Sequence, residues 1–333
     1  MSIQIIKQGM ADSIQDTGRY GLQYLGINPG GAMDKMAAQI ANLLVGNQLN
    51  DALIELHFPA STILFEEQTL IALSGADFEA TLNGSPIPLN TCIIVEKDTL
   101  LAFKKRVSGA RVYLSVLDGL SIMKWNNSYS TNLLANAGGF EGRYLRKNDK
   151  IGIRFTKNYS SLLKGRDFLP LSWKINVASF YYPDSFIRVI EGHEFSWLTD
   201  ESKQLLQSDS FTISMQSNRM GYRMKGKPFQ FFNIQQVIST GLTKGTIQVL
   251  PDGQIIILMT DHQTTGGYPR IAHVISADIP KLAQMNPDDD IYFQMITLQE
   301  AENIYYRQQL QLIQLQSDCK LRLNNYFTKH GLY

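Results

Sequence analysis

Residues 69–95 read TLIALSGADFEATLNGSPIPLNTCIIV, with apolar residues that alternate or run together on both sides of Asn83-Gly84. An Asn-Gly pair adopts the positive φ angles of a type I′ turn, so the stretch predicts a β-hairpin whose return strand lies near 87–95. Asp252-Gly253 is the same kind of signal, between TIQVL (246–250) and QIIILM (254–259). Short strands separated by turns indicate sheets that curl into barrels or sandwiches.

Helical signals are few. Residues 34–45, DKMAAQIANLLV, carry apolar side chains at helical spacing, with Asp34 as the N-cap. A second, short helix is predicted over 195–206. The glutamine-rich stretch from 297 to about 327 opens with the capping box TLQE and predicts a long C-terminal helix.

The length of 333 residues predicts two domains, at roughly 150 residues each. Between 157 and 180 the apolar periodicity disappears, and Gly165 and Pro170 interrupt the chain, so we place the boundary there. The predicted domains are residues 1–160 and 161–333. The fold class that follows is mainly β with a few helices.

The composition excludes several classes of function. Lysine and arginine number 31 and aspartate and glutamate 30, so the net charge of +1 offers no basic excess for nucleic acid. Cys92 and Cys319 lie far apart and form neither a disulfide framework nor a zinc motif. The longest aliphatic run, 255–259, is too short to span a membrane, and the N-terminus has no apolar signal run. We therefore expect a cytoplasmic protein that binds neither nucleic acid nor membrane.

One stretch that ordinary packing does not require is QSNRMGYRMKG, residues 216–226. Arg219 and Arg223 offer planar forks of donors that match carboxylate or phosphate oxygens, and Ser217 and Asn218 add polar groups beside them. The stretch therefore predicts an anion cradle. The alternative is a polar turn whose arginines lie in solvent, which composition alone favours.

A second stretch of this kind, TDHQTTGGYPRIA (260–272), follows an apolar strand directly. Gly266-Gly267 lets the backbone approach a ligand closely, and Asp261 is a candidate acid, base or orienting group. The alternative is a strand-ending loop in which His262 is an exposed bystander. The ligand-binding residues predicted in this loop are Gln263, Thr264, Thr265, Gly266, Gly267, Tyr268 and Arg270.

The glycine-rich segment IQDTGRYGLQYLGINPGGAMD, residues 14–34, demands a convoluted backbone. Asp16 and Arg19 within it either pair with each other or line a cleft. AMDKM (32–36) is superficially like a biotinylated AMKM tetrapeptide, but an aspartate interrupts it and begins a helix, so no covalent biotin is expected on Lys35. The chain has no GxxxxGKS or GxxxxGKT P-loop, no GxSxG elbow and no HExxH motif.

Several of these stretches occur in the order found in one family. They are SIQDTGRYG (13–21), GGAMD (30–34), ANLLVGN (41–47), GGFEGR (138–143), SNRMGYRMKG (217–226) and TTGGYPRIA (264–272). From about residue 3 to about residue 310 the chain resembles the biotin-dependent carboxyltransferase family, also called allophanate hydrolase subunit 2. The resemblance implies a pair of cyclophilin-like β-barrel domains. It also implies a place as the C subunit, beside subunits B and A, in an ATP-driven 5-oxoprolinase that opens 5-oxo-L-proline to L-glutamate.

The implied chemistry assigns roles to the candidate residues. A five-membered lactam is a stable amide, and ATP with Mg²⁺, bound by this chain or by a partner subunit, would turn its oxygen into a leaving group by phosphorylation. Such a step needs cationic donors and a clamp for the substrate carboxylate. These roles suit Arg219 and Arg223, with Asp261 as the third catalytic candidate, and no metal site built by protein residues is expected.

Two other activities stay open on the same resemblance. In the carboxyltransferase region of urea carboxylase, the same arginines and amides would bind a carboxylate and the biotin ureido oxygen. A non-catalytic relative counteracts an inhibitor of a sporulation histidine kinase, and the polar loops would then form a docking surface.

Overall fold

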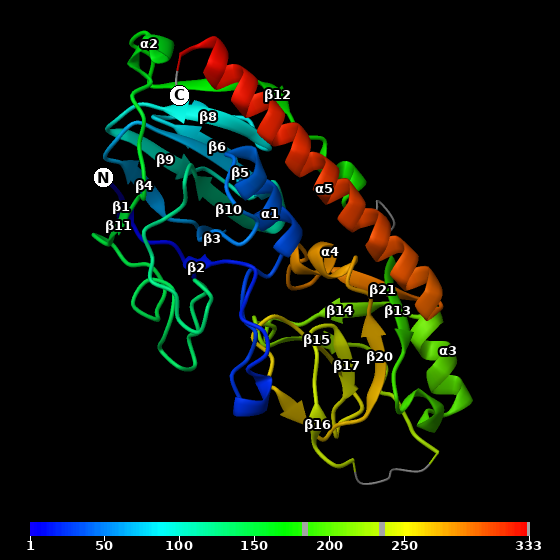
Figure 1. Ribbon diagram of the computed structural model, residues 1–333. Helices are drawn as coiled ribbons and strands as arrows, with labels where there is room; N and C mark the ends of the chain where they lie inside the picture. Colours follow the sequence, from blue (N-terminus) through cyan, green and yellow to red (C-terminus); the bar gives the residue numbers. More distant parts are fainter. Residues whose placement is uncertain (182–185, 233–236, 332–333) are drawn as a thin grey trace. The chain divides into compact units, whose positions relative to one another are not determined.

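The structure, a computed structural model, describes residues 1–181, 186–232 and 237–331. The chain divides into two compact units, whose elements are labelled in Figure 1. Unit 1 comprises Met1–Arg19, Asp34–Ser179 and Gln311–Tyr333. Unit 2 comprises Tyr20–Met33 and Phe180–Leu310. The chain therefore enters unit 2 twice, whereas the predicted ranges 1–160 and 161–333 assumed a single crossing.

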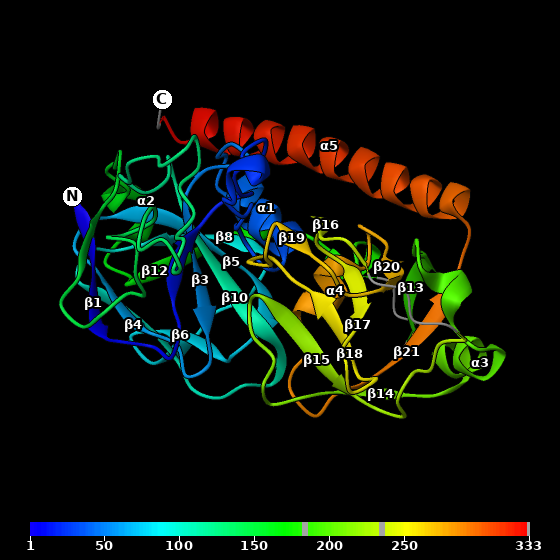
Figure 2. The ribbon, with the colours of Figure 1, turned by 90° about the horizontal axis from the view of Figure 1, so that it is seen from below.

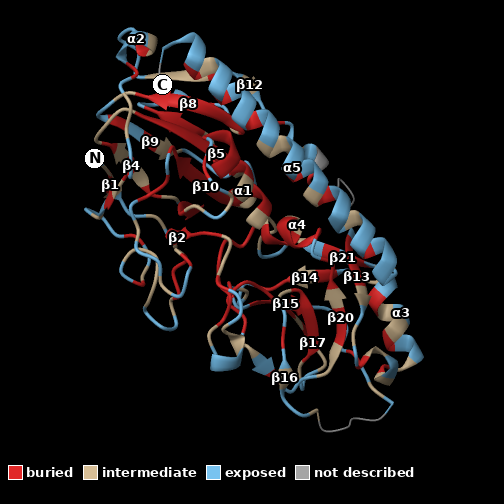
Figure 3. Cartoon of the chain, in the orientation of Figure 1, coloured by how far each residue is buried: buried red, intermediate tan, exposed pale blue. Residues whose placement is uncertain are grey.

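Unit 1 contains two six-stranded sheets, with the strand orders β11-β1-β4-β9-β6-β7 and β12-β8-β5-β10-β3-β2. The first consists of β1 (Ser2–Lys7), β4 (Thr62–Phe65), β6 (Ala80–Leu82), β7 (Ser85–Pro86), β9 (Thr99–Phe103) and β11 (Lys150–Gly152). The second consists of β2 (Ser13–Gln15), β3 (Leu53–His57), β5 (Thr69–Asp77), β8 (Thr91–Val95), β10 (Ser108–Val116) and β12 (Phe168–Lys174). Figure 3 shows β5, β8 and β10 buried along most of their length.

The core of unit 1 combines side chains from both sheets, among them Ile5, Phe65, Ile93 and Val112. Helix α1 (Lys35–Leu44) lies against β5 and β10. Its predicted N-cap is confirmed, because the Asp34 side chain accepts a hydrogen bond of 2.9 Å from the backbone N–H of Ala37.

The turn at Asn83-Gly84 is confirmed, with φ angles of 46° and 81° between β6 and β7. The return strand is shorter than predicted, since β7 ends at Pro86 and only the Ile87 N–H continues the pairing, with a hydrogen bond of 3.0 Å to the Ala80 carbonyl. Strand β8, which the sequence placed in the same hairpin, joins the second sheet beside β5 instead.

The stretch 157–180, predicted as the domain boundary, contains α2 (Ser160–Leu163), β12 and a 3-10 turn, η2 (Val177–Ser179). Strand β12 pairs with β8, and this pairing keeps the stretch in unit 1. Pro170 is tolerated in β12 because the strand lies at the sheet edge, where one ladder is missing anyway.

Unit 2 is a closed barrel of seven strands in the order β13-β20-β17-β18-β15-β14-β21. Its strands are β13 (Phe186–Glu191), β14 (Phe211–Ile213), β15 (Gly221–Lys225), β17 (Thr246–Val249), β18 (Ile255–Leu258), β20 (Arg270–Val274) and β21 (Asp290–Met295). A separate two-stranded ladder joins β16 (Thr240–Gly241) to β19 (Thr265–Gly266). The hairpin predicted at Asp252-Gly253 is confirmed by the antiparallel pair β17–β18.

The remaining helical elements of unit 2 are η1 (Gln23–Leu25), η3 (Phe195–Trp197), α3 (Asp200–Ser208) and α4 (Ile279–Ala283). Helix α5 (Leu298–Lys329) confirms the predicted long C-terminal helix, and its capping box is formed at 2.8 Å from Thr297 N–H to the Glu300 carboxylate and at 3.2 Å from Glu300 N–H to the Thr297 hydroxyl. A mainly β fold with few helices is thus confirmed. None of the described helices combines the length and apolarity needed to cross a bilayer.

Candidate functional site

A cleft of about 450 Å³ lies on the outer face of three neighbouring barrel strands, β15, β18 and β17, which Figure 2 shows side by side. Along β15 the side chains alternate, so that Tyr222 and Met224 enter the barrel core whereas Arg223 is exposed. The same alternation in β18 places Ile257 in the core and Ile256 in the cleft. The pleat of the strands therefore decides which residues form the floor of the cleft.

Strand register arranges the floor in rows. Arg223 lies opposite Ile256 in the β15–β18 pair, and Gln248 lies opposite Ile256 in the β18–β17 pair. In the next row Gly221 lies opposite Leu258. A Cβ atom on Gly221 would lie 2.7 Å from Cδ1 of Ile256, so glycine keeps this part of the floor open.

The lining combines an apolar floor with four carboxamides, one guanidinium, one carboxylate and one phenol. An arrangement of this kind suits a small polar molecule with an apolar middle. The lining residues are Gln216, Asn218, Met220, Gly221, Arg223, Gln248, Leu250, Pro251, Asp252, Ile256, Leu258, Gln263 and Tyr268.

Arg223 brings the positive charge of the lining, and its backbone is held by Ser217. The Ser217 hydroxyl accepts a hydrogen bond of 3.1 Å from Arg223 N–H and donates one of 3.3 Å to the Arg223 carbonyl. Within the described parts of the chain the Arg223 guanidinium forms no ion pair. Its donors are therefore available to a ligand, whereas the Ser217 hydroxyl, also predicted to bind a ligand, contacts the Arg223 backbone.

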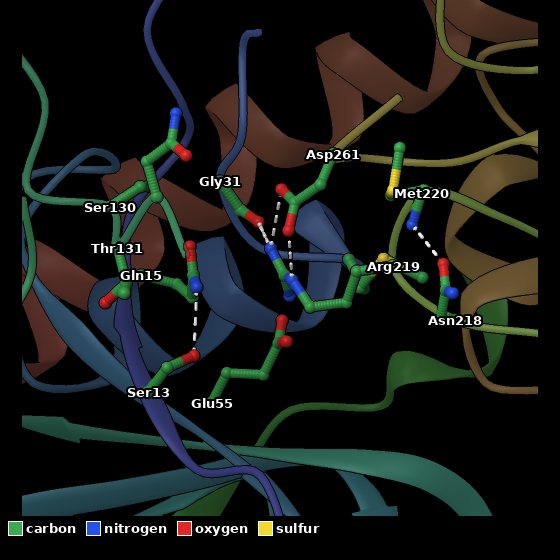
Figure 4. Close-up of polar contacts among 12 residues, drawn as sticks. Ser13, Gln15, Gly31, Glu55, Ser130, Thr131, Asn218, Arg219, Met220 and Asp261 are labelled. Atoms are coloured by element: carbon green, nitrogen blue, oxygen red, sulfur yellow. Dashed lines mark hydrogen bonds and ion pairs between the residues drawn. The ribbon is translucent and has the colours of Figure 1, made fainter. Parts of the chain in front are cut away.

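Arg219, four residues earlier, has a different setting, which Figure 4 shows. It is 8% exposed, and its Nε and Nη2 atoms donate to the two carboxylate oxygens of Asp261 at 2.7 and 3.2 Å. Nη2 also donates to the carbonyl of Gly31 at 2.7 Å, and the Asp261 N–H donates to the Arg219 carbonyl at 2.8 Å. This buried bidentate pair joins the two candidate loops, and its opposite charges neutralise each other.

The segment 20–33 completes the surroundings of this pair, a contribution that the sequence did not reveal. Asn28 donates from Nδ2 to the Asp261 carbonyl at 3.0 Å, and Lys244 donates from Nζ to the Met33 carbonyl at 2.9 Å. Met33 itself belongs to the barrel core. The glycine-rich stretch thus contributes its second half to unit 2 by carbonyl and carboxamide contacts.

The loop 260–272 divides into residues that reach the cleft and residues that do not. Gln263 and Tyr268 line it, and so does Asn218, whose side-chain oxygen accepts from Met220 N–H at 2.8 Å. The predicted ligand residues Thr264, Thr265, Gly266 and Gly267 lie outside the lining, and the middle two of them form β19.

Arg270 forms an ion pair with the carboxylate of Glu194. Its Nε and Nη2 atoms donate to Glu194 at 3.0 and 2.8 Å, its backbone N–H donates to the same carboxylate at 2.8 Å, and Nη1 donates to Thr240 at 2.9 Å. Burial alone would raise the pKa of Glu194, but the hydrogen bonds from Arg270 outweigh it and lower that pKa. Arg270, predicted to bind a ligand, is thus placed in an ion pair with Glu194 and outside the lining of the cleft.

His262 is 2% exposed, which corrects the expectation of an exposed side chain. Its Nδ1 lies 2.6 Å from the carbonyl oxygen of Gln263, and since a carbonyl only accepts, Nδ1 carries the proton. Burial lowers the pKa of His262, against the opposing effect of this hydrogen bond. The ring is therefore neutral at neutral pH.

In unit 1, Asp16 and Arg19 act separately. The Asp16 carboxylate accepts from two backbone N–H groups and two serine hydroxyls, while Arg19 donates to the Ser130 carbonyl and lies 4.7 Å from the centroid of the Trp125 ring.

Nowhere in the described residues do three or more His, Cys, Asp or Glu side chains gather into a metal-binding group.

A family model described as a carboxyltransferase domain, subdomain A and B, matches residues 25–295. The matched range includes all the residues of the cleft. The chain therefore belongs to the carboxyltransferase-domain family.

The chain is 36% identical over 299 residues to the C subunit of 5-oxoprolinase from Escherichia coli K12, an alignment that covers 90% of this chain and 93% of that protein. It is 34% identical to the C subunit of 5-oxoprolinase from Haemophilus influenzae Rd, with 94% and 97% covered. Among solved structures it matches the urea amidolyase of Kluyveromyces lactis with a TM-score of 0.84 and 25% identity. That match covers 94% of this chain but 20% of the amidolyase, so the chain spans about a fifth of that larger protein.

Proposed function

We propose that this chain is the C subunit of an ATP-dependent 5-oxoprolinase, which opens 5-oxo-L-proline to L-glutamate together with subunits B and A in the cytoplasm. The observation that carries the proposal is the cleft on β15, β18 and β17, where an exposed guanidinium faces an apolar floor ringed by carboxamides. The two relatives of matching length, both named as the C subunit of 5-oxoprolinase, support it.

5-Oxo-L-proline has the groups that this cleft can bind. Its carboxylate matches the planar fork of Arg223, and its methylene groups match the floor of Ile256 and Leu258. Because Ser217 clasps the backbone of Arg223 at both N–H and C=O, the guanidinium projects from a fixed point, as a carboxylate clamp requires. We assign the substrate contact to Arg223.

Arg219 and Asp261 then have a positioning role. Each neutralises the other, and the Arg219 Nε and Nη2 donors are used within the pair and its contact with Gly31. The pair ties the loop that precedes β15 to the loop that follows β18, and both loops line the cleft. Losing it would therefore move the walls of the cleft rather than remove a reacting group.

The cleft does not fit a magnesium nucleotide. It offers one guanidinium against the several charges of a triphosphate, and Asp261, which could otherwise supply a carboxylate for magnesium, is held in an ion pair with Arg219. We therefore assign ATP to another subunit of the assembly and the substrate carboxylate to this one.

The test is reconstitution with subunits A and B, following 5-oxoproline-dependent release of ADP together with glutamate. We expect both products in step, and neither when this chain is omitted. Arg223→Ala is expected to lower kcat/KM about 100- to 1,000-fold, the usual loss of a positioned charge-assisted donor. Arg166→Ala, at an exposed arginine of unit 1, is the matched control and should change nothing.

Two results would contradict the proposal. Full turnover by Arg223→Ala would remove Arg223 from the site. A folded, assembled complex without 5-oxoproline-dependent ADP release would overturn the function itself, and carboxybiotin with urea would be the next substrates, since the urea amidolyase structure shares this fold over 94% of the chain.

A further inference from the structure

Gln248 is the one polar residue in the floor of the cleft that is almost wholly buried. It is 1% exposed, it lies on β17 in the middle of the barrel wall, and its side chain points outward to line the cleft. No motif in the sequence singles it out. A buried carboxamide normally has its hydrogen bonds satisfied, so the partners of its two ends are informative.

The orientation of the Gln248 carboxamide follows from its contact with Tyr268. Nε2 donates to the backbone carbonyl of Tyr268 at 3.2 Å, and because a carbonyl cannot donate, the nitrogen must be the end that faces it. The oxygen, Oε1, is then the end left for the cleft. Within the described residues no donor forms a hydrogen bond with Oε1, and Oε1 retains some exposure to solvent.

Gln248 and Arg223 stand at opposite ends of one row across the floor, with Ile256 between them. Since neighbouring strands lie about 4.8 Å apart, the two Cα atoms are separated by about 10 Å. One end of the row is a donor fork for an anion, the middle is apolar, and the other end is a lone acceptor oxygen. A ligand that satisfies the row carries a carboxylate for Arg223, an N–H group for Oε1 and apolar carbon atoms over Ile256. 5-Oxo-L-proline has its carboxylate on the ring carbon next to the N–H, and its two methylene groups belong to the same small ring.

We propose that Gln248 is a specificity-determining residue that selects ligands bearing an amide N–H, so that the cleft takes small carboxylate-bearing amides of the lactam class. The proposal deepens the proposed function and rests on it for the identity of the reaction, but it can be tested by binding alone. Replacing the N–H by N–CH₃ would leave Oε1 without a donor and put a methyl group against it. The geometry thus distinguishes two compounds that carry the same carboxylate.

The experiment measures the affinity of the full chain, and of the assembled complex, for 5-oxo-L-proline and for its N-methyl derivative by calorimetry. We expect the wild type to favour the N–H compound about 10- to 100-fold, the usual effect of leaving one buried polar group unpaired. Gln248→Met keeps the length and lacks the acceptor oxygen. It is expected to bring the ratio close to one while Arg223 still binds the carboxylate.

Gln299→Met is the matched control, because Gln299 is an exposed glutamine of α5 that does not line the cleft, and the ratio should stay at the wild-type value. An equal affinity of the wild type for both compounds would overturn the proposal, even if Gln248→Met fails to fold. So would an unchanged ratio in a folded Gln248→Met protein, or a failure of both chain and complex to bind 5-oxoproline. A preserved ratio in a complex without turnover would instead refute the proposed function and leave the role of Gln248 standing.

Discussion

Two polar clusters, one in each unit, are built from glycine-bearing loops and differ in how fully their hydrogen bonds are used. In unit 1 the Asp16 carboxylate, 4% exposed, accepts from Gly18 N–H at 2.7 Å, from Tyr129 N–H at 2.6 Å, and from the hydroxyls of Ser128 and Ser130. In unit 2, Arg223 is exposed, and no carboxylate of the described residues forms an ion pair with it.

The difference separates polar groups that stabilise the fold from polar groups that are available to a ligand. Asp16 has two oxygens and four donors, so its loop is closed by its own contacts. In the cleft the guanidinium of Arg223 and Oε1 of Gln248 have room for partners that the described residues do not provide. Both places hold several polar side chains, and only the number of satisfied groups tells them apart.

The largest effect on stability is expected at the closed cluster. Asp16→Ala would leave two backbone N–H groups and two hydroxyls without their acceptor, which should lower the free energy of unfolding by about 3–5 kcal/mol. Urea denaturation measures this. Asp318→Ala, at an exposed aspartate of α5, should lie within about 0.5 kcal/mol of the wild type, and an equally small effect at Asp16 would break the comparison.

Asp12 makes unit 1 sensitive to pH. Burial raises the pKa of its carboxyl group to about 6, against the opposing hydrogen bonds from Ser61 and His57 N–H, and the nearby Glu55 raises it further. Between pH 3.8 and about 6 the folded state keeps a proton that the unfolded state has released. The contribution of this proton to the free energy of unfolding is therefore complete below pH 3.8 and is lost as the pH rises through about 6.

We therefore expect the stability difference between wild type and Asp12→Asn to fall by about 2–3 kcal/mol between pH 4 and 7, and to stay constant above pH 7. Denaturation curves of both proteins at a series of pH values measure it. A difference that does not change with pH would show that Asp12 does not titrate in this window.

Gly221→Ala tests whether the floor of the cleft must stay open for a ligand. The new Cβ would lie 2.7 and 2.9 Å from Cδ1 and Cγ1 of Ile256, so the floor must shift. We expect a stability loss of about 1 kcal/mol and a clear loss of affinity for 5-oxoproline, measured on the same preparation. Gly241→Ala, where a Cβ meets nothing within 4 Å, is the control and should affect neither quantity.

The smallest stability effect is expected at Arg223. Because its side chain is exposed and unpaired among the described residues, Arg223→Ala should change the free energy of unfolding by less than about 0.5 kcal/mol. Arg270→Ala would leave the buried Glu194 without its partner and should cost about 3–5 kcal/mol. Equal losses of stability in the two variants would refute the distinction between Arg223, which has no ion-pair partner among the described residues, and Arg270, which is paired with Glu194.

Local signals in the sequence predicted the elements that local chemistry determines. The turns at Asn83-Gly84 and Asp252-Gly253, the Asp34 cap of α1 and the capping box of α5 all depend on residues within a few positions of one another. The same reasoning failed for β12, which pairs with the distant β8, and for β8 itself, which pairs with β5 and not with the neighbouring hairpin.

Local patterns in the sequence were enough to predict the mainly β class, the family motifs and the short list of polar residues around 216–226 and 260–272. Which of the three arginines is open to a ligand depends on tertiary contacts. Arg219 meets Asp261, 42 positions away, and Arg270 meets Glu194, 76 positions away, while no described carboxylate reaches Arg223. Charge pairing over such separations depends on which strands fold side by side. The register that turns the side chains of Gln248 and Arg223 to the outer face in one row depends on it too.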